Sequence, residues 1–340
     1  MRIGLLTGGG DCPGLNAVIR AVVRRAEMEY GDTIIGFRNG WKGMAEGDIV
    51  DLSVDSTRGL VTRGGTILGT ARYHPHEHPD GTGMVFESFK RNRLDAVICI
   101  GGDGTLAAAG ELAAAGLPMV GVPKTIDNDV SGTDYSVGFD TAVFIAADAL
   151  DRVQTTGESH NRVMVVEVMG RNNGWIALSA GIAAGAEAIL IPEAPFDIDE
   201  LSKQLRHRHR RARSSVVVVA EGAVPLEGTV DWTPPVGKFG SIVAGAVGEM
   251  VRREIEERTG FDSRLTVLGH VQRGGTPTPT DRVLGSRFGV AAVDAVRQGE
   301  SGVMVALQSG SIVRVPIEQI AGERKPLPDE LVEVARSLTV

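Results

Sequence analysis

Short apolar runs rich in valine and isoleucine alternate with longer helical patterns through most of this chain of 340 residues. The runs at 96–100 and 216–220 are apolar at every position, which is typical of strands buried on both faces of a sheet. Strands that alternate with helices form βαβ units, in which helices cover both faces of a parallel sheet. The pattern therefore predicts an α/β fold with doubly wound, Rossmann-like architecture and mainly parallel sheets.

This pattern predicts the individual elements by their residue ranges. The expected strands are 3–6, 96–100, 119–122, 163–168, 216–220, 265–268 and 303–307. The expected helices are 15–30, 106–115, 141–154, 174–184, 198–206, 242–258 and 281–297.

The length indicates two domains, since single domains usually have roughly 100–200 residues. A boundary is expected after Gly138, where a loop ends and a new helix begins. The expected division is 1–138 plus about 272–312 for one domain, and 139–271 plus about 313–340 for the other. The proline-containing stretch 224–238 is interpreted as an irregular surface segment rather than a linker.

The charge balance excludes some classes of partner. The chain has 35 lysines and arginines against 43 aspartates and glutamates, a net charge of −8, which disfavours nucleic acids and anionic membranes. The basic cluster at 206–213 has no interleaved aromatic residues and is interpreted as a solvated helix end or a phosphate-effector site. No apolar run reaches about 18 residues. Two cysteines, Cys12 and Cys99, suit a reducing compartment, so a cytoplasmic protein is expected.

Glycine accounts for 45 residues, nearly twice its usual share of about 7%. Two glycine loops have the same design: Gly-Gly-Gly-Asp at 8–11 and Gly-Gly-Asp-Gly at 101–104 each follow an apolar run and precede a helix. Such loops let backbone N–H groups approach phosphate oxygens at a helix N-terminus. Either loop alone can be a simple strand-to-helix turn, but two copies with aspartates favour phosphate binding. Asp103 adds a hard oxygen ligand that suits Mg²⁺.

A third loop, at 123–129, follows the expected strand 119–122 and should reach the same edge of the sheet. If this loop is extended, Asp127 and Asp129 point to one side, so that one carboxylate can take a proton while the other positions it or a metal. The alternative is a turn rich in Asp and Asn. The nearby phosphate loops favour a catalytic role.

Together these segments resemble the 6-phosphofructokinases, and specifically an actinobacterial-like group that mixes ATP-dependent and pyrophosphate-dependent features. The segments are TGGGD at 7–11, PGLN at 13–16, RGGT at 63–66, GTAR at 69–72, GGDGT at 101–105, PKTIDND at 123–129, MGR at 169–171, AEG at 220–222 and RLTVLGHVQRGG at 264–275. GGDGT alone also resembles NAD kinases and lipid kinases, which have no reason to carry the arginines and the histidine of a sugar-phosphate clamp.

The resemblance implies phosphorylation of the 1-hydroxyl of fructose 6-phosphate by ATP with Mg²⁺, in a cleft between the two domains. It implies that the domain of 1–138 binds the nucleotide as phosphoryl donor and that the domain of 139–271 binds fructose 6-phosphate. The implied catalytic residues are Asp127 as general base, Thr125, Arg171 and Arg72, with Asp103 as the metal ligand. The implied ATP-binding residues are Gly10, Arg72, Tyr73, Gly102, Asp103, Gly104 and Thr105. The implied substrate-binding residues are Thr125, Asp127, Asp129, Arg162, Met169, Gly170, Arg171, Glu221, Arg264, His270 and Arg273. A homotetramer, or a dimer, is implied, in which Arg162 and Arg264 complete a neighbouring subunit's site.

Two positions bear on the choice of phosphoryl donor. Pyrophosphate-dependent members of the family usually have an aspartate where this chain has Gly104 and a lysine where it has Lys124, whereas typical bacterial ATP enzymes have glycine at both. Gly104 leaves uncharged space for an α-phosphate, which an aspartate would repel. ATP is therefore the predicted donor and pyrophosphate the alternative. An inactive nucleotide-sensing subunit would need damage at Asp103, Asp127 or Arg171, and all three are present.

The run His74-Pro75-His76-Glu77-His78-Pro79 resembles a metal-binding tract, since alternation places three imidazoles on one face of an extended segment. The flanking prolines favour a solvated loop instead. This loop follows Arg72 and Tyr73, so it is expected at the rim of the nucleotide cleft.

Overall fold

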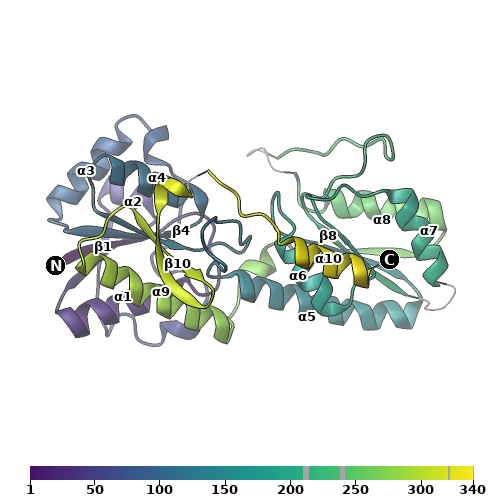
Figure 1. Ribbon diagram of the computed structural model, residues 1–340, viewed down its shortest axis with the longest axis horizontal. Helices are drawn as coiled ribbons and strands as arrows, with labels where there is room; N and C mark the ends of the chain where they lie inside the picture. Colours follow the sequence, from purple (N-terminus) through teal and green to yellow (C-terminus); the bar gives the residue numbers. More distant parts are fainter. Residues whose placement is uncertain (210–213, 238–241, 321, 340) are drawn as a thin grey trace. The chain divides into compact units, whose positions relative to one another are not determined.

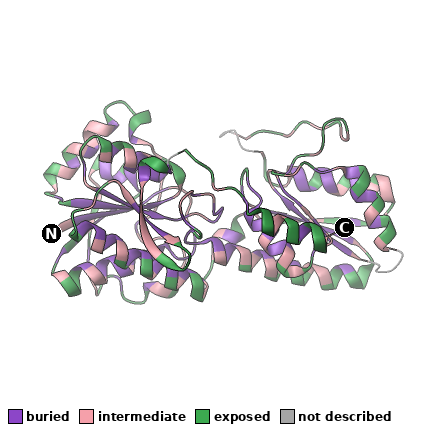
Figure 2. Cartoon of the chain, viewed as in Figure 1, coloured by how far each residue is buried: buried purple, intermediate pink, exposed green. Residues whose placement is uncertain are grey.

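The computed structural model describes residues 1–209, 214–237, 242–320 and 322–339. The chain forms two compact units: unit 1 contains Met1–Thr141 and Arg273–Lys325, and unit 2 contains Ala142–Gln272 and Pro326–Val340. Each unit has one sheet with helices packed on it (Figure 1). Buried residues concentrate in the strands and on the inward faces of the helices, while the outward helix faces are exposed (Figure 2).

The sheet of unit 1 is parallel in its centre and antiparallel at both edges, so the expected mainly parallel sheet is confirmed. Its strand order is β11-β10-β5-β4-β1-β2-β3. The strands are β1 (Arg2–Thr7), β2 (Thr33–Phe37), β3 (Ile49–Leu52), β4 (Ala96–Gly101), β5 (Met119–Pro123), β10 (Val303–Gln308) and β11 (Ser311–Pro316).

Helices cover both faces of this sheet. Figure 1 shows α1 and α9 on one face and α2, α3 and α4 on the other. The helices are α1 (Leu15–Tyr30), α2 (Trp41–Glu46), α3 (Gly81–Arg91), α4 (Asp103–Ala114) and α9 (Pro279–Arg297). On the face of the sheet that α2, α3 and α4 cover, the strands and helices enclose an apolar cluster that includes Phe37, Trp41 and Leu112. This is the doubly wound arrangement that the alternation of apolar runs and helical patterns predicts.

Unit 2 has a smaller, fully parallel sheet with the order β7-β8-β6-β9. Its strands are β6 (Val163–Val168), β7 (Ala188–Leu190), β8 (Ser215–Ala220) and β9 (Ser263–Val267). Its helices are α5 (Phe139–His160), which starts in unit 1, α6 (Trp175–Ala184), α7 (Ile198–His209), α8 (Ala246–Thr259) and α10 (Asp329–Leu338). Figure 1 shows α7 and α8 on one side of this sheet and α5 and α6 on the other.

All seven expected strands and seven expected helices are present, with ends shifted by a few residues. Seven elements were not expected: β2, β3, β7, β11, α2, α3 and α10. These elements are short, lie at a sheet edge, or carry mixed polar and apolar residues, so they lack a strong periodic signal.

The expected boundary near residue 312 is wrong. Residue 312 lies inside β11, which pairs antiparallel with β10 in the sheet of unit 1. Ser309 and Gly310 join the two strands, and both have positive φ (49° and 81°), as a two-residue hairpin turn requires. The chain leaves unit 1 only after Lys325.

The remaining expectations concern irregular or polar segments. From 224 to 237 the chain forms turns and isolated bridges, as expected for a surface segment. In the basic cluster, residues 206–209 form the end of α7, where Arg208 forms an ion pair with Glu187 (2.7 Å); residues 210–213 lie outside the described part of the chain. None of the described helices combines the length and the apolar character that crossing a membrane requires.

Asp281 joins the start of α5 to the start of α9. Its side chain is fully buried and accepts hydrogen bonds from the backbone N–H groups of Gly138 (2.8 Å) and Thr141 (2.8 Å) and from the Thr141 hydroxyl (2.5 Å). These bonds hold the segment where the chain passes from unit 1 into unit 2.

We predict that Asp281→Ala destabilises unit 1 by about 3 kcal/mol, because three buried donors lose their acceptor. Hydrogen exchange of the β1 amides, at the centre of the sheet, should then be about 100-fold faster. Asp48→Ala is the matched control: its carboxylate is 41% exposed and pairs with Arg38 at the surface, so exchange should change less than about fivefold. Equal effects of the two substitutions would contradict the role of Asp281.

Candidate active site

Three loops meet at one edge of the sheet in unit 1. They follow β1, β4 and β5, which are neighbours in the sheet and run parallel. Thr7 pairs with Ile100 and Gly101 with Pro123, so the three strands end side by side. The backbone N–H of Gly8 donates to the Ile100 carbonyl (2.9 Å), which joins the first loop to β4. The two glycine loops and the 123–129 loop therefore share one sheet edge, as expected.

The side chain of Lys124 holds the first glycine loop. Its ammonium group donates to the carbonyl oxygens of Gly8 (3.0 Å) and Gly10 (2.6 Å), and the residue is only 2% exposed. Burial lowers the pKa of this lysine, and nearby acidic groups including Asp127 oppose that shift. Lys124 thus joins the end of β5 to the loop after β1.

The carbonyl of Gly9, the middle glycine, is also held: the hydroxyl of Thr70 donates to it (2.5 Å). In a trans peptide the carbonyl and the following N–H point in opposite directions. Since the three glycine carbonyls point at Lys124 and Thr70, the N–H groups of residues 9–11 point away from these donors. A row of such amides is an arrangement that binds anions.

Arg273 lies beside the same loop. Its guanidinium donates to the Asp11 carbonyl (3.2 Å), and a Cβ at Gly10 would approach its nitrogen to 2.6 Å. A side chain at position 10 would therefore require the Arg273 guanidinium to shift. Arg273 belongs to unit 1, whereas Arg162, Arg264 and His270, the other members of the implied sugar-phosphate clamp, belong to unit 2.

The second glycine loop leads into α4, whose first residue, Asp103, is exposed. Apart from the chain neighbours and the backbone of its own helix, no heavy atom of the described residues lies within 4 Å of the position that a Cβ on Gly104 would take, whereas Gly102 has the Lys124 carbonyl at 3.4 Å. Thr105 is only 6% exposed, and a Cβ at Gly8 would lie 2.5 Å from its hydroxyl. Thr105 thus packs between the two glycine loops, while Gly104 is exposed and the Asp103 carboxylate accepts a hydrogen bond from the N–H of Gly322 (3.4 Å).

The third loop turns instead of extending, so the expectation that Asp127 and Asp129 alternate along an extended segment is wrong. The residue between them, Asn128, has φ +52°, and its side-chain oxygen accepts a hydrogen bond from the N–H of Ser136 (3.0 Å). Asp127 is 2% exposed, and its N–H donates to the Thr125 hydroxyl (3.1 Å). The turn buries Asp127 and leaves Asp129 half-buried.

Sequence reasoning missed Lys325, which reaches this loop from the end of unit 1. Its N–H donates to the Asp129 carbonyl (3.0 Å), and its ammonium group donates to the carbonyl of Asp134. Burial lowers the pKa of Lys325 to about 8, against the opposing effect of Asp134 and Asp129. No local sequence signal indicates this contact, because it depends on a bridge between Val130 and Arg324, far apart in the chain.

The segment 63–70 lies next to the first glycine loop, and Arg72 and Tyr73 follow it. Besides the contact of Thr70 with Gly9, the hydroxyl of Thr7 donates to the Gly69 carbonyl (2.8 Å). Arg72 is exposed, whereas Tyr73 packs partly against the apolar cluster of unit 1.

In unit 2, a second set of expected residues gathers where β6, β8 and β9 end. Glu221 follows β8 and accepts hydrogen bonds at one carboxylate oxygen from the N–H groups of Gly170 (3.2 Å) and Arg171 (2.7 Å). Arg171 is exposed and has φ +53°, so the loop after β6 bends sharply here. Met169 is half-buried in that loop, and His270 is exposed after β9.

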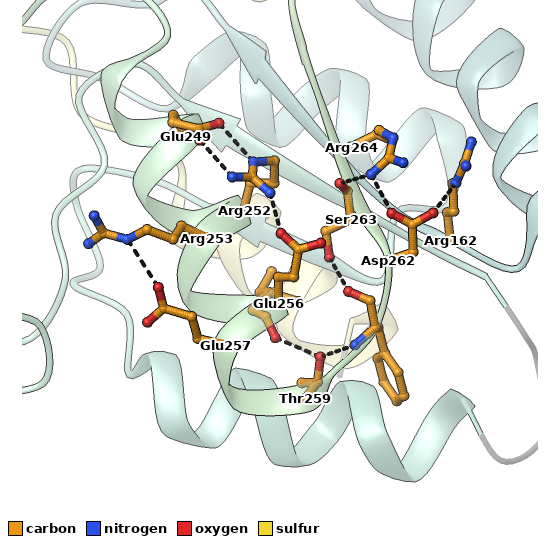
Figure 3. A network of polar contacts seen from close by, with 12 residues as sticks. Arg162, Glu249, Arg252, Arg253, Glu256, Glu257, Thr259, Asp262, Ser263 and Arg264 are labelled. Atoms are coloured by element: carbon orange, nitrogen blue, oxygen red, sulfur yellow. Dashed lines mark hydrogen bonds and ion pairs between the residues drawn. The ribbon is translucent and has the colours of Figure 1, made fainter.

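Arg162 and Arg264 lie at the opposite end of these strands, where β6 and β9 begin. Arg162 precedes β6, and Arg264 pairs with the second residue of β6. Asp262 lies between the two arginines and forms ion pairs with both, with 2.5 Å between Arg162 Nε and its carboxylate (Figure 3). A strand rises about 3.3 Å per residue, so roughly 16 Å of β6 separates these arginines from the Arg171 loop. The structure therefore does not bring Arg162 and Arg264 together with Arg171, Glu221 and His270 within one chain.

Comparison with known proteins identifies relatives over nearly the whole chain. Residues 2–296 match the family described as phosphofructokinase. A Streptomyces coelicolor protein named pyrophosphate–fructose 6-phosphate 1-phosphotransferase is 52% identical over 335 residues, covering 98% of each chain. A second S. coelicolor protein, named ATP-dependent 6-phosphofructokinase 3, is 52% identical over 332 residues and covers 97% of each.

Solved structures show the same fold. The Pichia pastoris phosphofructokinase in the T-state matches 99% of this chain with a TM-score of 0.84 and 34% identity, and the chain spans 36% of the length of that protein. A Marinobacter aquaeolei protein described as a pyrophosphate-dependent phosphofructokinase matches the fold with a TM-score of 0.84 at 22% identity.

We predict that Lys124→Met destabilises unit 1 by about 2 kcal/mol, because the carbonyls of Gly8 and Gly10 lose their donor while the side-chain volume is retained. In this variant, hydrogen exchange of the β1 amides should be about 30-fold faster than in the wild type. Lys203→Met is the control, since Lys203 is exposed and pairs with Glu200 at the surface. If Lys124→Met leaves the exchange rates unchanged, the lysine does not stabilise the loop.

Proposed function

This chain belongs to the phosphofructokinase family, and we propose that it transfers the terminal phosphoryl group of ATP to the 1-hydroxyl of fructose 6-phosphate, giving fructose 1,6-bisphosphate and ADP. The open space at Gly104 is the observation that carries the choice of ATP. Relatives of similar identity carry both ATP-dependent and pyrophosphate-dependent names, so the choice depends on the site of this chain.

The surroundings of Gly104 and Lys124 favour ATP over pyrophosphate. Among the described residues, no heavy atom from outside the adjoining chain lies near the Cβ position of Gly104, so position 104 itself adds neither a side chain nor a negative charge where an α-phosphate would lie. The Lys124 ammonium is buried and held by two loop carbonyls, so it supports the phosphate loop from behind. A lysine that is buried and hydrogen-bonded in this way is compatible with either donor. Gly104 is therefore the residue that distinguishes ATP from pyrophosphate.

Asp127 is the general base in this proposal. It takes the proton from the 1-hydroxyl, whose oxygen attacks the terminal phosphorus as the bond to the leaving ADP oxygen breaks. The side chain is 2% exposed and sits in a turn fixed by Thr125 and Asn128, so its position is set before substrate binds. A fixed base reduces the entropic cost of reaching the reactive geometry.

The oxygen donors at this edge suit Mg²⁺, which prefers oxygen ligands and usually binds through one or two carboxylates and the substrate phosphates. Asp103 is the proposed ligand, because its carboxylate is exposed at the start of α4 beside the open space at Gly104. When bound, the ion neutralises charge on the donor phosphates.

Cationic groups and amides stabilise the transferred phosphoryl group. The amides of residues 9–11 form the anion-binding row, and Arg273 lies beside them. Arg72 and Arg171 are exposed at their loops and are proposed to contact the transferred phosphoryl oxygens. A guanidinium can donate two parallel hydrogen bonds to a phosphate, which a lysine cannot do. The remaining residues proposed to bind the sugar phosphate are Met169, Gly170, Glu221, His270 and Asp129.

We further propose a homo-oligomer, a tetramer or a dimer, in which Arg162 and Arg264 bind the 6-phosphate in a neighbouring subunit's site. Their position at the opposite sheet edge from Arg171 supports this assignment, since one chain cannot place all three around one sugar phosphate. Asp262 holds both arginines at the surface of unit 2.

The alternatives make different demands on the site. Pyrophosphate as donor remains the competing activity, because it needs phosphate contacts but no space for a nucleoside. An inactive sensor would have no use for a buried Asp127 at the end of β5.

The proposal includes a cytoplasmic location, which the two free, buried cysteines support.

We predict that the purified protein phosphorylates fructose 6-phosphate with ATP, and that Gly104→Asp lowers kcat/KM for ATP at least about 100-fold by charge repulsion. Gly104→Ala, which adds volume without charge, should lower it less than about tenfold. A coupled assay with ATP and with pyrophosphate measures both donors. Turnover with pyrophosphate and none with ATP would overturn the choice of donor.

Subunit complementation tests the placement of Arg162. Arg162→Ala and Asp127→Ser should each lower activity at least about 100-fold on their own. When the two variants are co-expressed, a mixed oligomer contains sites with an intact Asp127 from one chain and an intact Arg162 from its neighbour, so activity should return in part. No recovery in mixed oligomers would show that Arg162 does not serve a neighbouring site.

A further inference from the structure

Two histidines and a glutamate from separate segments of unit 1 come together near its surface. His74 and His76 flank Pro75 at a short 3₁₀ turn, and Glu111 lies on α4. Each offers one ligand atom, and these atoms all lie within 4.8 Å of one another. Among the described residues, this is the single group of three or more such side chains close enough to hold a metal ion.

The ligand atoms lie near the spacing of a metal site, with His76 and Glu111 in direct contact. His76 Nδ1 lies 2.5 Å from a Glu111 carboxylate oxygen, and the rings of His74 and His76 have centroids 5.8 Å apart with a tilt of 54°. Tetrahedral zinc with ligands at about 2.0–2.1 Å places those ligand atoms roughly 3.4 Å apart. Rotations of exposed side chains are enough to reach this spacing, since His76 and Glu111 are 38% and 48% exposed.

His74 provides an independent indication of a ligand. Its Nδ1 atom is buried and has no hydrogen-bond partner among the described residues. A buried polar nitrogen without a partner carries a desolvation cost. A metal ion held between His74, His76 and Glu111 offsets that cost if it is bound through His74 Nδ1, and it gives the carboxylate and both imidazoles a common partner.

The fold holds the ligand-bearing segments in place before any ion binds. Pro75 is buried, and Tyr73 packs against the apolar cluster of unit 1. The third histidine of the run, His78, stacks on Tyr73 with 4.0 Å between ring centroids, so it points away from the cluster. The three histidines therefore do not share one face, in line with the expectation that the prolines disfavour that arrangement, and Glu111 lies with His74 and His76 where a third histidine would have been.

We propose that His74, His76 and Glu111 form a binding site for a divalent transition-metal ion of the zinc class, with water at the fourth position. Imidazole nitrogens favour such ions, whereas Mg²⁺ favours oxygen ligands, so this site differs in chemistry from the one at Asp103. Asp103 and Glu111 are eight residues apart on α4, about 12 Å along the helix. The ion joins the segment after Arg72 to the helix that begins at Asp103.

Titration of the untagged, full-length protein with Zn²⁺ in a calorimeter, and with Co²⁺ by its visible absorption, tests this site. The wild-type chain should bind one ion that excess Mg²⁺ does not displace. His74→Ala, His76→Ala and Glu111→Gln should each weaken binding at least about tenfold, since even partners of metal ligands contribute 10–100-fold. His78→Ala, in the same run but outside the cluster, should bind as the wild type does.

Circular dichroism of the metal-free variants checks that they fold, which is expected because His76 and Glu111 are exposed and His74 lies at a turn. The proposal is overturned if a variant lacking all three ligands binds Zn²⁺ as tightly as the wild type. It is also overturned if Glu111→Gln has no effect on affinity, or if His78→Ala loses as much as His74→Ala.

Discussion

The buried ammonium group of Lys124 is the contact on which the phosphate-binding edge of unit 1 depends. It joins the end of β5 to the carbonyls of Gly8 and Gly10 after β1, two strands away in the sheet. Because those carbonyls point at the lysine, the neighbouring amides point away and are available to an anion. The same lysine lies beside the turn that holds Asp127. One buried cation therefore organises both the donor loop and the proposed base.

In unit 2, the proposed functional residues are divided between the two ends of the strands of its parallel sheet. Loops at the carboxyl ends of the strands carry Arg171, Glu221 and His270, as is usual in α/β proteins. Arg162 and Arg264 lie at the other end, held by Asp262 at the surface. A site that needs all of these residues must be assembled from more than one chain, which makes oligomerisation part of substrate binding in the proposed enzyme.

The helix α4 connects the proposed activity with the proposed metal site. Its first turn carries Asp103 and the open Gly104, and two turns later it carries Glu111 beside His74 and His76. The two ends of the helix differ in chemistry: carboxylate and phosphate oxygens suit a hard ion at its start, and imidazoles suit a softer ion further along. A metal ion at the second place would fix the segment that follows Arg72 without competing for the ligands of the first.

The sequence by itself determined the α/β class, seven strands and seven helices, the order of the three loops at the sheet edge and the resemblance to the 6-phosphofructokinases, because apolar periodicity and motifs are local properties of the chain. It did not determine the hairpin of β10 and β11, the turn at Asn128 or the contact of Lys325 with the Asp129 loop. The hairpin gives only a weak pattern at the sheet edge, the turn at Asn128 is closed by a hydrogen bond from Ser136, and the contact of Lys325 joins residues almost two hundred positions apart. Only the tertiary structure decided that the Lys124 ammonium group donates to the carbonyls of Gly8 and Gly10, and that Glu111 instead of His78 lies with His74 and His76. The physical reason is that the packing of distant segments sets which groups meet.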